Sequence, residues 1–366
     1  MIPIATLLLL NNLNLCKLQK KELKLTECSY EYWESLVPLI SKVNFLQSWQ
    51  FGAAKEESSK WCAKRFVIMD SDGGPIAIFQ MLICKWPIIG GIARINRGPL
   101  FMSEIIDDQN YEILEDSIKL IFDLCIANRL FVLQIAPEFN MLSAEIIAQL
   151  KSLGFNRLKN EPWSSALMDL SEPEDFILKK IDGKWRNSML KGFKQNVNVE
   201  ILSINNTNIE SLITIYESLQ IKQNFKGLPS CLIRALAFQS SLNYSFNLFE
   251  ATTSGPEPFS LGHLVSIRHG DISTYLIGAT NNEGRKISVN SFLLWHAILN
   301  AKNSGCSWFD LGGLSNSTTS GVAAFKKGLN GIAYQLVGEW RKYFGISILQ
   351  NFFNRNKRGL APIINI

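Results

Sequence analysis

Apolar and polar positions follow two recurring patterns along the chain, and together they predict a mixed α/β protein. Apolar residues three or four positions apart predict amphipathic helices, whereas short apolar runs predict buried strands. In the first half, we expect helices at 29–40, 48–60, 110–129 and 141–153, and strands at 65–69, 76–84, 92–97, 130–136 and 165–170. In the second half, we expect helices at 174–181, 184–195, 208–222, 232–239, 289–303 and 322–328, and strands at 197–203, 244–252, 260–268, 271–278, 307–311 and 333–337.

The two halves share one order of elements: helices, antiparallel strands, a long helix, a buried strand, a helix and a closing strand. The corresponding hairpins are shifted by roughly 180 residues, as in an internal structural repeat. A chain of 366 residues is also long enough for about two domains. We therefore expect two domains, residues 1–170 and 171–366, each a mixed, mostly antiparallel sheet flanked by helices.

Composition narrows the class, and the charge distribution separates the halves. Hydrophobic residues make up 47% and charged residues 19%, which excludes a disordered, collagen-like or coiled-coil chain. The net charge of +5 is uneven: residues 1–170 carry 17 basic and 19 acidic side chains, and residues 171–366 carry 20 and 13. The basic second half indicates either an anionic partner or ordinary surface charge.

The cysteines, the histidines and the lengths of the apolar runs indicate where the protein is located and whether it binds a metal. Seven scattered cysteines without a CxxC pair are typical of free thiols in a reducing compartment. Three isolated histidines give no zinc-binding pattern, so we expect no metal. We expect neither a secretory signal at the N-terminus nor a transmembrane helix. These features predict a cytoplasmic protein.

The sharpest chemical pattern lies near the end of the second half. A buried strand delivers Asp310 to Gly312 and Gly313, and a Ser/Thr/Asn-rich loop then leads to a short helix with Phe325 and Lys326. Glycines at a strand end permit close approach to a ligand, and the lysine ammonium can stabilise an oxyanion or a phosphate. We favour a functional site here over a plain turn with a surface lysine.

Three other segments carry candidate binding residues, each with a structural alternative. Trp49 and Lys55 share a helix, where either Trp49 packs inward while Lys55 reaches a cleft, or the two are a core tryptophan and a solvated lysine. Arg97 precedes Gly-Pro at a strand end and suits a phosphate or carboxylate, or is an exposed turn residue. Arg186 and Lys191 belong to a basic helix that either binds an anion or is a solvated face.

These segments occur in one order: Gln-Ser-Trp with Lys55, Arg97-Gly-Pro, the basic 184–194 helix, Tyr275-Leu-Ile-Gly-Ala, and the Asp310 and Lys326 segments. This order resembles the FemABX peptidyltransferase family and related FemAB-like proteins of the GNAT acyltransferase superfamily. The resemblance covers roughly residues 45–340 and implies two tandem GNAT-like domains, the first on the acceptor side and the second on the donor side.

The resemblance further implies a non-ribosomal aminoacyltransferase of cell-wall (peptidoglycan) biogenesis. Such an enzyme moves an aminoacyl group from aminoacyl-tRNA to an amine of a UDP- or lipid-linked envelope precursor. Phe325 and Lys326 would lie near the aminoacyl ester, and Lys55 and Arg186 would hold the precursor's phosphates. The expected catalytic residues are Lys326, Phe325 and Asp310, and the expected substrate-binding residues are Lys55, Trp49, Arg97, Arg186, Lys191, Tyr275, Gly312 and Gly313.

Two other functions stay open. One is an N-acyltransferase of envelope polysaccharide synthesis that uses acyl-CoA or an acyl carrier, although the glycine-rich loop for CoA phosphates is absent before residues 289–303. The other is a non-catalytic nucleotide-sugar-binding module. We expect a monomer with no bound cofactor. The basic, amphipathic stretch from Trp340 onward either contacts the inner membrane face or docks on its own domain.

Overall fold

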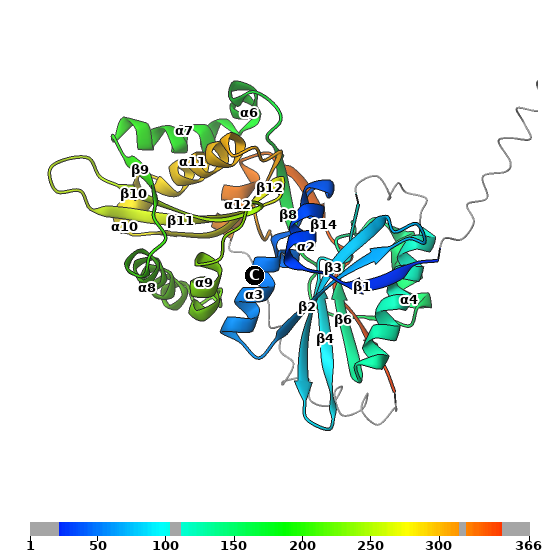
Figure 1. Ribbon diagram of the computed structural model, residues 1–366. Coiled ribbons are helices and arrows are strands. Elements are labelled where there is room, and N and C mark those ends of the chain that lie inside the picture. The colour runs from blue at the N-terminus through cyan, green and yellow to red at the C-terminus, as the bar shows by residue number, and fades with distance from the viewer. Residues whose placement is uncertain (1–21, 103–110, 315–319, 346–366) are drawn as a thin grey trace, which may run out of the picture.

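The computed structural model describes residues 22–102, 111–314 and 320–345, which form two lobes, each built on one sheet (Figure 1). The first lobe contains β1 (Lys24–Glu27), α2 (Tyr30–Leu36), α3 (Trp49–Ser58), β2 (Cys62–Met69), β3 (Pro75–Trp86), β4 (Gly90–Asn96), β5 (Leu100–Phe101), α4 (Tyr111–Ala127), β6 (Leu130–Ala136), α5 (Ala144–Ser152) and β7 (Asn156–Arg157), with 3-10 turns at Val37–Leu39 and Phe45–Gln47.

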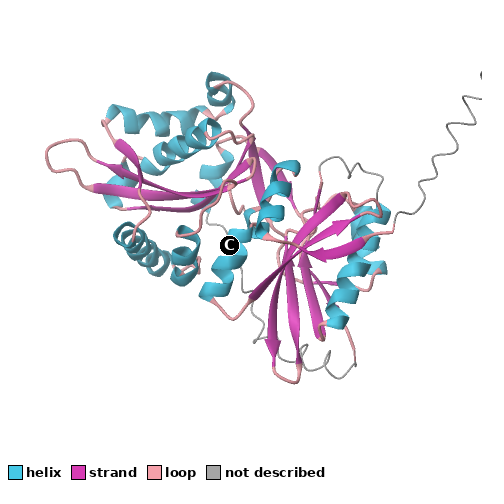
Figure 2. Ribbon diagram, in the orientation of Figure 1, coloured by secondary structure: helices cyan, strands magenta, loops and turns pink. Residues whose placement is uncertain are grey.

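The second lobe follows the same plan, with helices on the faces of its sheet (Figure 2). It contains α6 (Glu174–Lys180), α7 (Gly183–Lys194), β9 (Asn198–Leu202), α8 (Asn206–Gln223), α9 (Ser230–Ala237), β10 (Tyr244–Thr252), β11 (Ser260–His269), β12 (Ile272–Thr280), α10 (Asn282–Lys286), α11 (Val289–Asn303), β13 (Trp308–Asp310), α12 (Ser320–Lys327) and β14 (Ile332–Gln335). The remaining strands are β8 (Ser164–Asp169) and β15 (Trp340–Tyr343).

The two sheets have corresponding strand orders. The first runs β1-β2-β3-β4-β6-β15-β7, with β5 beside β3, and the second, taken from its other end, runs β9-β10-β11-β12-β13-β8-β14. In each sheet the fourth and fifth strands pair in parallel (β4 with β6, β12 with β13), whereas the other pairings between the described strands are antiparallel. The expected class, a mixed and mostly antiparallel α/β repeat, is confirmed.

The lobes exchange one strand each. β8, which precedes the second lobe, inserts between β13 and β14, and β15, which follows it, inserts between β6 and β7. Their side chains complete the opposite cores: Trp340 is fully buried beneath α4 and α5, and Met168 lies in the core beneath α7 and α11. The domain boundary between residues 170 and 171 remains a prediction. The strands of the two sheets do not divide there, because β8 belongs to the second sheet and β15 to the first.

The sequence suggested a basic amphipathic stretch that begins at Trp340. In the structure, residues 340–343 form a strand instead. Trp340–Tyr343 form β15 because the buried indole and the ladder to β6 outweigh the local pattern of charges. The rest of the expected tail, residues 346–366, lies outside the described residues, as does the N-terminal apolar run. None of the helices in the described part of the chain is long and apolar enough to cross a membrane.

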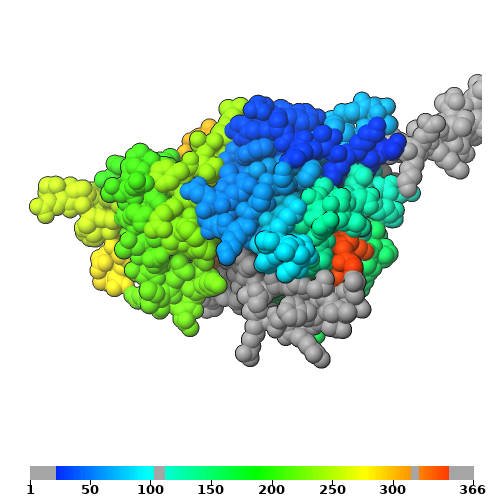
Figure 3. Space-filling model, turned by 60° about the horizontal axis from the view of Figure 1, so that its bottom comes forward, coloured from blue at the N-terminus to red at the C-terminus, as the bar shows by residue number. Residues whose placement is uncertain are grey.

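The helix α3 joins the lobes. Ser48 caps it, as predicted, because the Ser48 hydroxyl accepts a hydrogen bond of 2.9 Å from the backbone N–H of Phe51. Phe51 and Ala54 pack with α8, α9 and one face of the second sheet. In the space-filling view the blue surface of this segment borders the green surface of the second lobe (Figure 3).

Candidate functional site

The second sheet opens at the point where β12 and β13 diverge. These parallel strands pair only over Ile272–Thr274 and Trp308–Asp310. Beyond the pairing, Gly312 has a φ of +68°. A Cβ at Gly312 would lie 2.7 Å from the carbonyl oxygen of Tyr275, so only glycine lets the chain leave the strand this way. The predicted glycine exit is therefore a close backbone approach between the two diverging strands.

Asp310 is buried and fixes this exit through both carboxylate oxygens. Its Oδ1 accepts hydrogen bonds from the Ser165 hydroxyl and from the backbone N–H of Gly312, the latter at 2.7 Å. Its Oδ2 accepts a hydrogen bond of 2.7 Å from the Tyr334 hydroxyl. Burial and the Asp310 charge hold the pKa of Tyr334 well above its usual value, so this phenol remains a donor. The carboxylate therefore ties β8 and β14 to the glycine turn.

Lys326 lies beside the same turn, with only 6% of its surface exposed. Its Nζ donates a hydrogen bond of 2.9 Å to the carbonyl oxygen of Gly313 and lies 5.1 Å from the centroid of the Tyr275 ring. Burial lowers the pKa of Lys326 to about 8, although the Asp310 charge opposes the shift. At pH 7 the ammonium form therefore outweighs the amine by about ten to one. The site presents a poorly solvated cation at a glycine-lined opening.

Phe325 anchors the helix that carries Lys326. The Phe325 ring centroid lies 6.0 Å from that of Trp185 on α7, and Phe325 packs against the core beneath α7 and α11. Consecutive helical residues project about 100° apart, so this packing turns Lys326 toward the glycine exit. The geometry gives Phe325 a positioning role, whereas its predicted contact with the donor stays a prediction.

Arg97 connects the first lobe to this turn. Its guanidinium carbon lies 5.1 Å from the centroid of the Trp163 ring, and that ring packs against Gly313, where a Cβ would lie 3.2 Å from it. Arg97 has a φ of +58° and its backbone N–H donates a hydrogen bond of 2.7 Å to the carbonyl oxygen of Ala136. The structure thus brings Arg97, Tyr275, Asp310, Gly312, Gly313 and Lys326 into one connected cluster.

A cavity of about 390 Å³ lies where the lobes meet on the Asp310 side of this cluster. Its walls combine apolar side chains from both lobes with the polar groups of Asn44, Glu138, Asp310 and Tyr334. This size and mixed lining are typical of a small-ligand site. The cavity places polar groups of both lobes within reach of one ligand.

Lys55 lies on α3 and is 6% exposed. Burial lowers its pKa, and the charge of Arg94 on β4 lowers it further. Arg94 in turn forms an ion pair of 2.9 Å with Glu339. Because the Glu339 carboxylate pairs with Arg94, the positive charge of Lys55 has no carboxylate partner among the contacts of the described residues. Lys55 therefore lies in a positively charged, partly desolvated place with Arg94 as its neighbour, and its binding of an anion stays a prediction.

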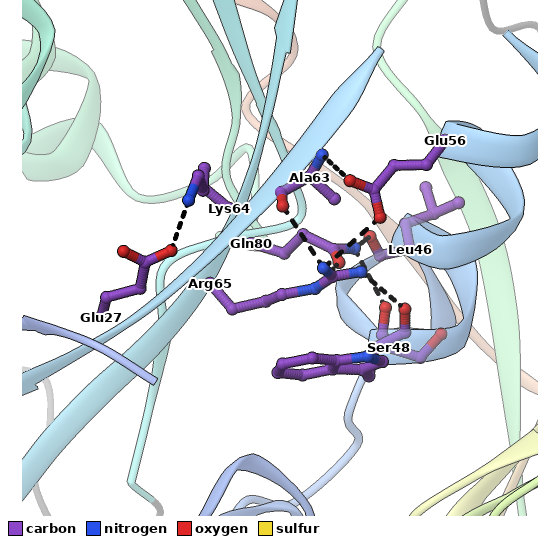
Figure 4. Close-up of polar contacts among 9 residues, drawn as sticks. Glu27, Leu46, Ser48, Glu56, Ala63, Lys64, Arg65 and Gln80 are labelled. Atoms are coloured by element: carbon purple, nitrogen blue, oxygen red, sulfur yellow. Dashed lines mark hydrogen bonds and ion pairs between the residues drawn. The ribbon is translucent and has the colours of Figure 1, made fainter. Parts of the chain in front are cut away.

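The ring of Trp49 is used for packing within the first lobe. The guanidinium of Arg65 lies 4.2 Å from the Trp49 ring centroid, and Trp33 packs edge-on against the same ring. Arg65 also donates hydrogen bonds to Gln80 and to the carbonyl oxygen of Trp49, and forms an ion pair of 3.6 Å with Glu56 (Figure 4). Trp49 thus stabilises a buried arginine, which is the structural alternative for this residue.

Arg186 and Lys191 lie on α7, away from Lys55. α7 packs with α11 on one face of the second sheet, whereas α3 packs with α8 and α9 on the other face, and the ribbon shows this separation (Figure 1). The structure therefore does not bring Lys55 and Arg186 together, and the expectation that they hold the precursor's phosphates stays a prediction. The basic helix does face outward, because Lys191 is exposed and Arg186 is partly exposed.

The part of the chain that carries Tyr275, Asp310 and Lys326 matches the model of a known protein family. Residues 241–346 match the model of the FemAB family. The crystal structure of FemX shares the fold with a TM-score of 0.77 at 16% identity, covering 91% of this chain and 100% of FemX. The resemblance of this chain to FemAB-like proteins is thereby confirmed, and the two-lobed, mixed α/β architecture is shared with FemX.

Two further solved structures share the fold more distantly. L-PGS from Bacillus licheniformis has a TM-score of 0.51 at 11% identity, covering 90% of this chain and 97% of that one. A conserved protein of unknown function from Bacteroides thetaiotaomicron VPI-5482 has a TM-score of 0.53 at 8% identity, covering 88% and 100%. No curated protein matches the chain in sequence.

Several residues of the cluster and cavity escaped prediction from the sequence. Ser165 and Tyr334 bind Asp310 from strands distant in sequence, and Trp163 bridges Arg97 and Gly313. Glu138 carried a usable signal, since it follows the almost wholly apolar 130–136 strand, much as Asp310 lies near the end of the 307–311 strand. A carboxylate at the end of a buried strand was therefore informative in both halves.

Proposed function

We propose that the protein is an acyltransferase that moves an activated aminoacyl group from aminoacyl-tRNA to an amine of a UDP- or lipid-linked cell-envelope precursor. One observation carries this proposal: the buried Lys326 ammonium beside the Gly312–Gly313 exit lies within the segment that matches the FemAB family. The two-lobed fold shared with FemX supports it. A donor and acceptor of these kinds place the reaction in the cytoplasm, at or near the inner membrane face.

The cluster suits acyl transfer because the donor ester is already activated. The protein then has to align amine and carbonyl, and to stabilise the oxyanion of the tetrahedral intermediate. The Lys326 ammonium supplies positive charge in a partly desolvated place, where it acts more strongly than in water. Asp310 holds the glycine turn and favours the charged form of Lys326. Gly312 and Gly313 let the chain pass close to Tyr275 and Trp163, next to the Lys326 ammonium.

The anionic part of the acceptor is assigned to Lys55 and Arg94. Burial and, to a lesser extent, the nearby charge of Arg94 lower the pKa of Lys55, and a bound phosphate would relieve the repulsion between the two cations. Lysine binds phosphate as a point charge and arginine binds it through a planar fork. Because Arg186 lies on the other face of the second sheet, it is not part of this phosphate site.

The segment before α11 favours aminoacyl-tRNA over acyl-CoA as the donor. In a CoA site, free backbone amides at this position cradle the pyrophosphate. Here the segment folds into α10, and Asn281 accepts hydrogen bonds from the backbone N–H groups of Gly284 (2.8 Å) and Arg285 (3.1 Å). These amides are therefore already engaged.

A donor screen tests the proposal. Aminoacyl-tRNAs and acyl-CoAs are each incubated with a UDP-linked muropeptide or simple amines, and amide products are detected by mass spectrometry. We expect products from aminoacyl-tRNA, none with Lys326→Ala, and normal yield with Lys327→Ala, which changes an exposed lysine of the same helix. Products from acyl-CoA alone would identify the other donor class. Undiminished turnover by Lys326→Ala would remove the assigned role, and binding without turnover for every donor would indicate a non-catalytic module.

A further inference from the structure

Two carboxylates occupy corresponding places in the two lobes and meet at the cavity between them. Glu138 follows β6, and Asp310 ends β13, which are the fifth strands of their sheets. Both side chains line the 390 Å³ cavity. The charge of Asp310 contributes to the raised pKa of Glu138, so the two carboxylates interact electrostatically across the lobes. The internal repeat has thus placed two acids beside one ligand-sized space.

Their surroundings differ in hydrogen-bond donors. Asp310 accepts from Ser165, Gly312 and Tyr334, which leaves this carboxylate stabilised as an anion. Glu138 accepts only a hydrogen bond of 3.3 Å from Asn44 to Oε1, and its buried Oε2 has no donor among the described residues. A buried acceptor without a donor costs free energy until something donates to it. Glu138 therefore presents an open acceptor position at the cavity.

The charged and titratable groups around Glu138 leave its pKa near neutral pH. Burial and Asp310 raise the pKa of Glu138 to about 7, against the opposing effects of Arg97 and the Asn44 hydrogen bond. Tyr334 also faces Glu138, but its hydroxyl donates to Asp310. Lys42 lines the cavity, with its Nζ 4.0 Å from the centroid of the Trp308 ring. A carboxyl with these neighbours is suited to accept and release a proton near neutral pH.

We propose that the cavity between the lobes receives the amine of the acceptor and that Glu138 accepts the proton from its nitrogen. An amine is the ligand chemistry that fits, because its N–H satisfies the open Oε2 and its cationic form is attracted by two carboxylates. The inference rests on the proposed function. It assigns the proton acceptor to Glu138 in place of Asp310, whose oxygens are engaged and which acts as a positioning residue.

The proton balance closes with these groups. The bound ammonium first loses one proton to water, and as the neutral amine nitrogen bonds to the acyl carbon, a second proton passes from nitrogen to the Glu138 carboxylate. The bond between the acyl carbon and the donor oxygen then breaks, and the protonated Glu138 returns the proton to the leaving oxygen, directly or through water. The products are an amide and a free hydroxyl, and the carboxylate is regenerated.

Glu138→Gln tests the catalytic part, because glutamine keeps the size and the Asn44 contact but takes no proton. We expect kcat to fall by at least about 100-fold, with the KM for the donor unchanged and the acidic limb of the pH–rate profile lost. Glu145→Gln, at an exposed carboxylate on α5, should behave like wild type. Asp310→Asn should lower the rate but keep the acidic limb. An acidic limb retained in Glu138→Gln would overturn the assignment.

Calorimetric binding without a donor tests the cavity independently of turnover. The probes are Nα-acetyl-lysine amide and its Nε-acetylated form. We expect wild type and Glu145→Gln to prefer the free amine by at least about tenfold, and Glu138→Gln to lose this preference. Equal binding of both probes by wild type would overturn the inference even if transfer is observed. Amine preference without transfer from any donor would instead refute the proposed function and the proton-transfer step, while supporting the cavity as an amine site.

Discussion

Replacing Lys326 with methionine should stabilise the protein while removing its activity. The folded state lowers the pKa of Lys326 from 10.5 to about 8, a difference of about 2.5 units. At 1.36 kcal/mol per unit, keeping this ammonium buried costs the folded state about 3 kcal/mol at neutral pH. Because the folded pKa is the lower one, the unfolded chain binds the proton more tightly. The cost is therefore complete below pH 8 and disappears as the pH rises toward 10.5.

Methionine removes the charge at similar length but also removes the hydrogen bond to the Gly313 carbonyl, which contributes about 1 kcal/mol. We therefore expect Lys326→Met to raise the free energy of unfolding by about 2 kcal/mol at pH 7. The advantage should shrink as the pH rises above 8 and turn into a loss of about 1 kcal/mol above pH 10.5, where Lys326 is neutral in both the folded and the unfolded chain. Such a residue is retained for function at the expense of stability.

Urea denaturation measures this difference across pH 7 to about 10. The control is Lys327→Met, which changes an exposed lysine on the same helix and should stay within about 0.5 kcal/mol of wild type. An unchanged slope with a shifted midpoint would assign the effect to stability alone. A Lys326→Met protein that is less stable than wild type at pH 7, or a difference that does not vary with pH, would refute the reasoning.

Three further predictions concern the glycine exit, the anion site and the pH profile. Gly312→Ala puts a Cβ 2.7 Å from a backbone carbonyl oxygen at a φ of +68°, so urea denaturation should show a loss of about 1–3 kcal/mol or more. Lys55→Ala should raise the KM for a phosphate-bearing acceptor with little change in kcat, whereas Lys60→Ala, at an exposed lysine, should change neither in steady-state kinetics. The rate should be bell-shaped in pH, rising as Glu138 deprotonates near pH 7 and falling as Lys326 loses its charge near pH 8.

The regular elements could be predicted where the pattern is long or wholly apolar. The 130–136 strand and the 289–303 helix match the structure residue for residue. Short strands such as Leu100–Phe101 and Trp340–Tyr343 escaped, because two to four residues carry too little periodicity. The exchange of β8 and β15 is a matter of which distant strands pair, and local patterns do not encode the partner.

The candidate site could be predicted in part where its residues are local in sequence. Asp310 and Lys326 were singled out because a strand end, glycines and a helix follow one another along the chain, and the structure places both beside the glycine turn, while their catalytic roles stay predictions. Tyr334 was missed because its contact with Asp310 depends on the position of β14 across the sheet. Trp49 and Arg186 were over-interpreted for the same reason. The local pattern around Trp49 does not reveal that its ring covers the buried Arg65, and the basic pattern around Arg186 does not reveal which face of the sheet its helix covers.

The exchanged strands impose an order on how the molecule is completed during synthesis. The first sheet keeps a gap between β6 and β7 until β15 emerges, so the first lobe is finished only after the entire second lobe has been made. Until then, unpaired edges flank the gap. Once both sheets are complete, each lobe contains a strand from the other side of residues 171–173. A single cut in the backbone there would therefore leave the two halves bound to each other. The two walls of the cavity therefore stay in register without relying on an unbroken chain between them.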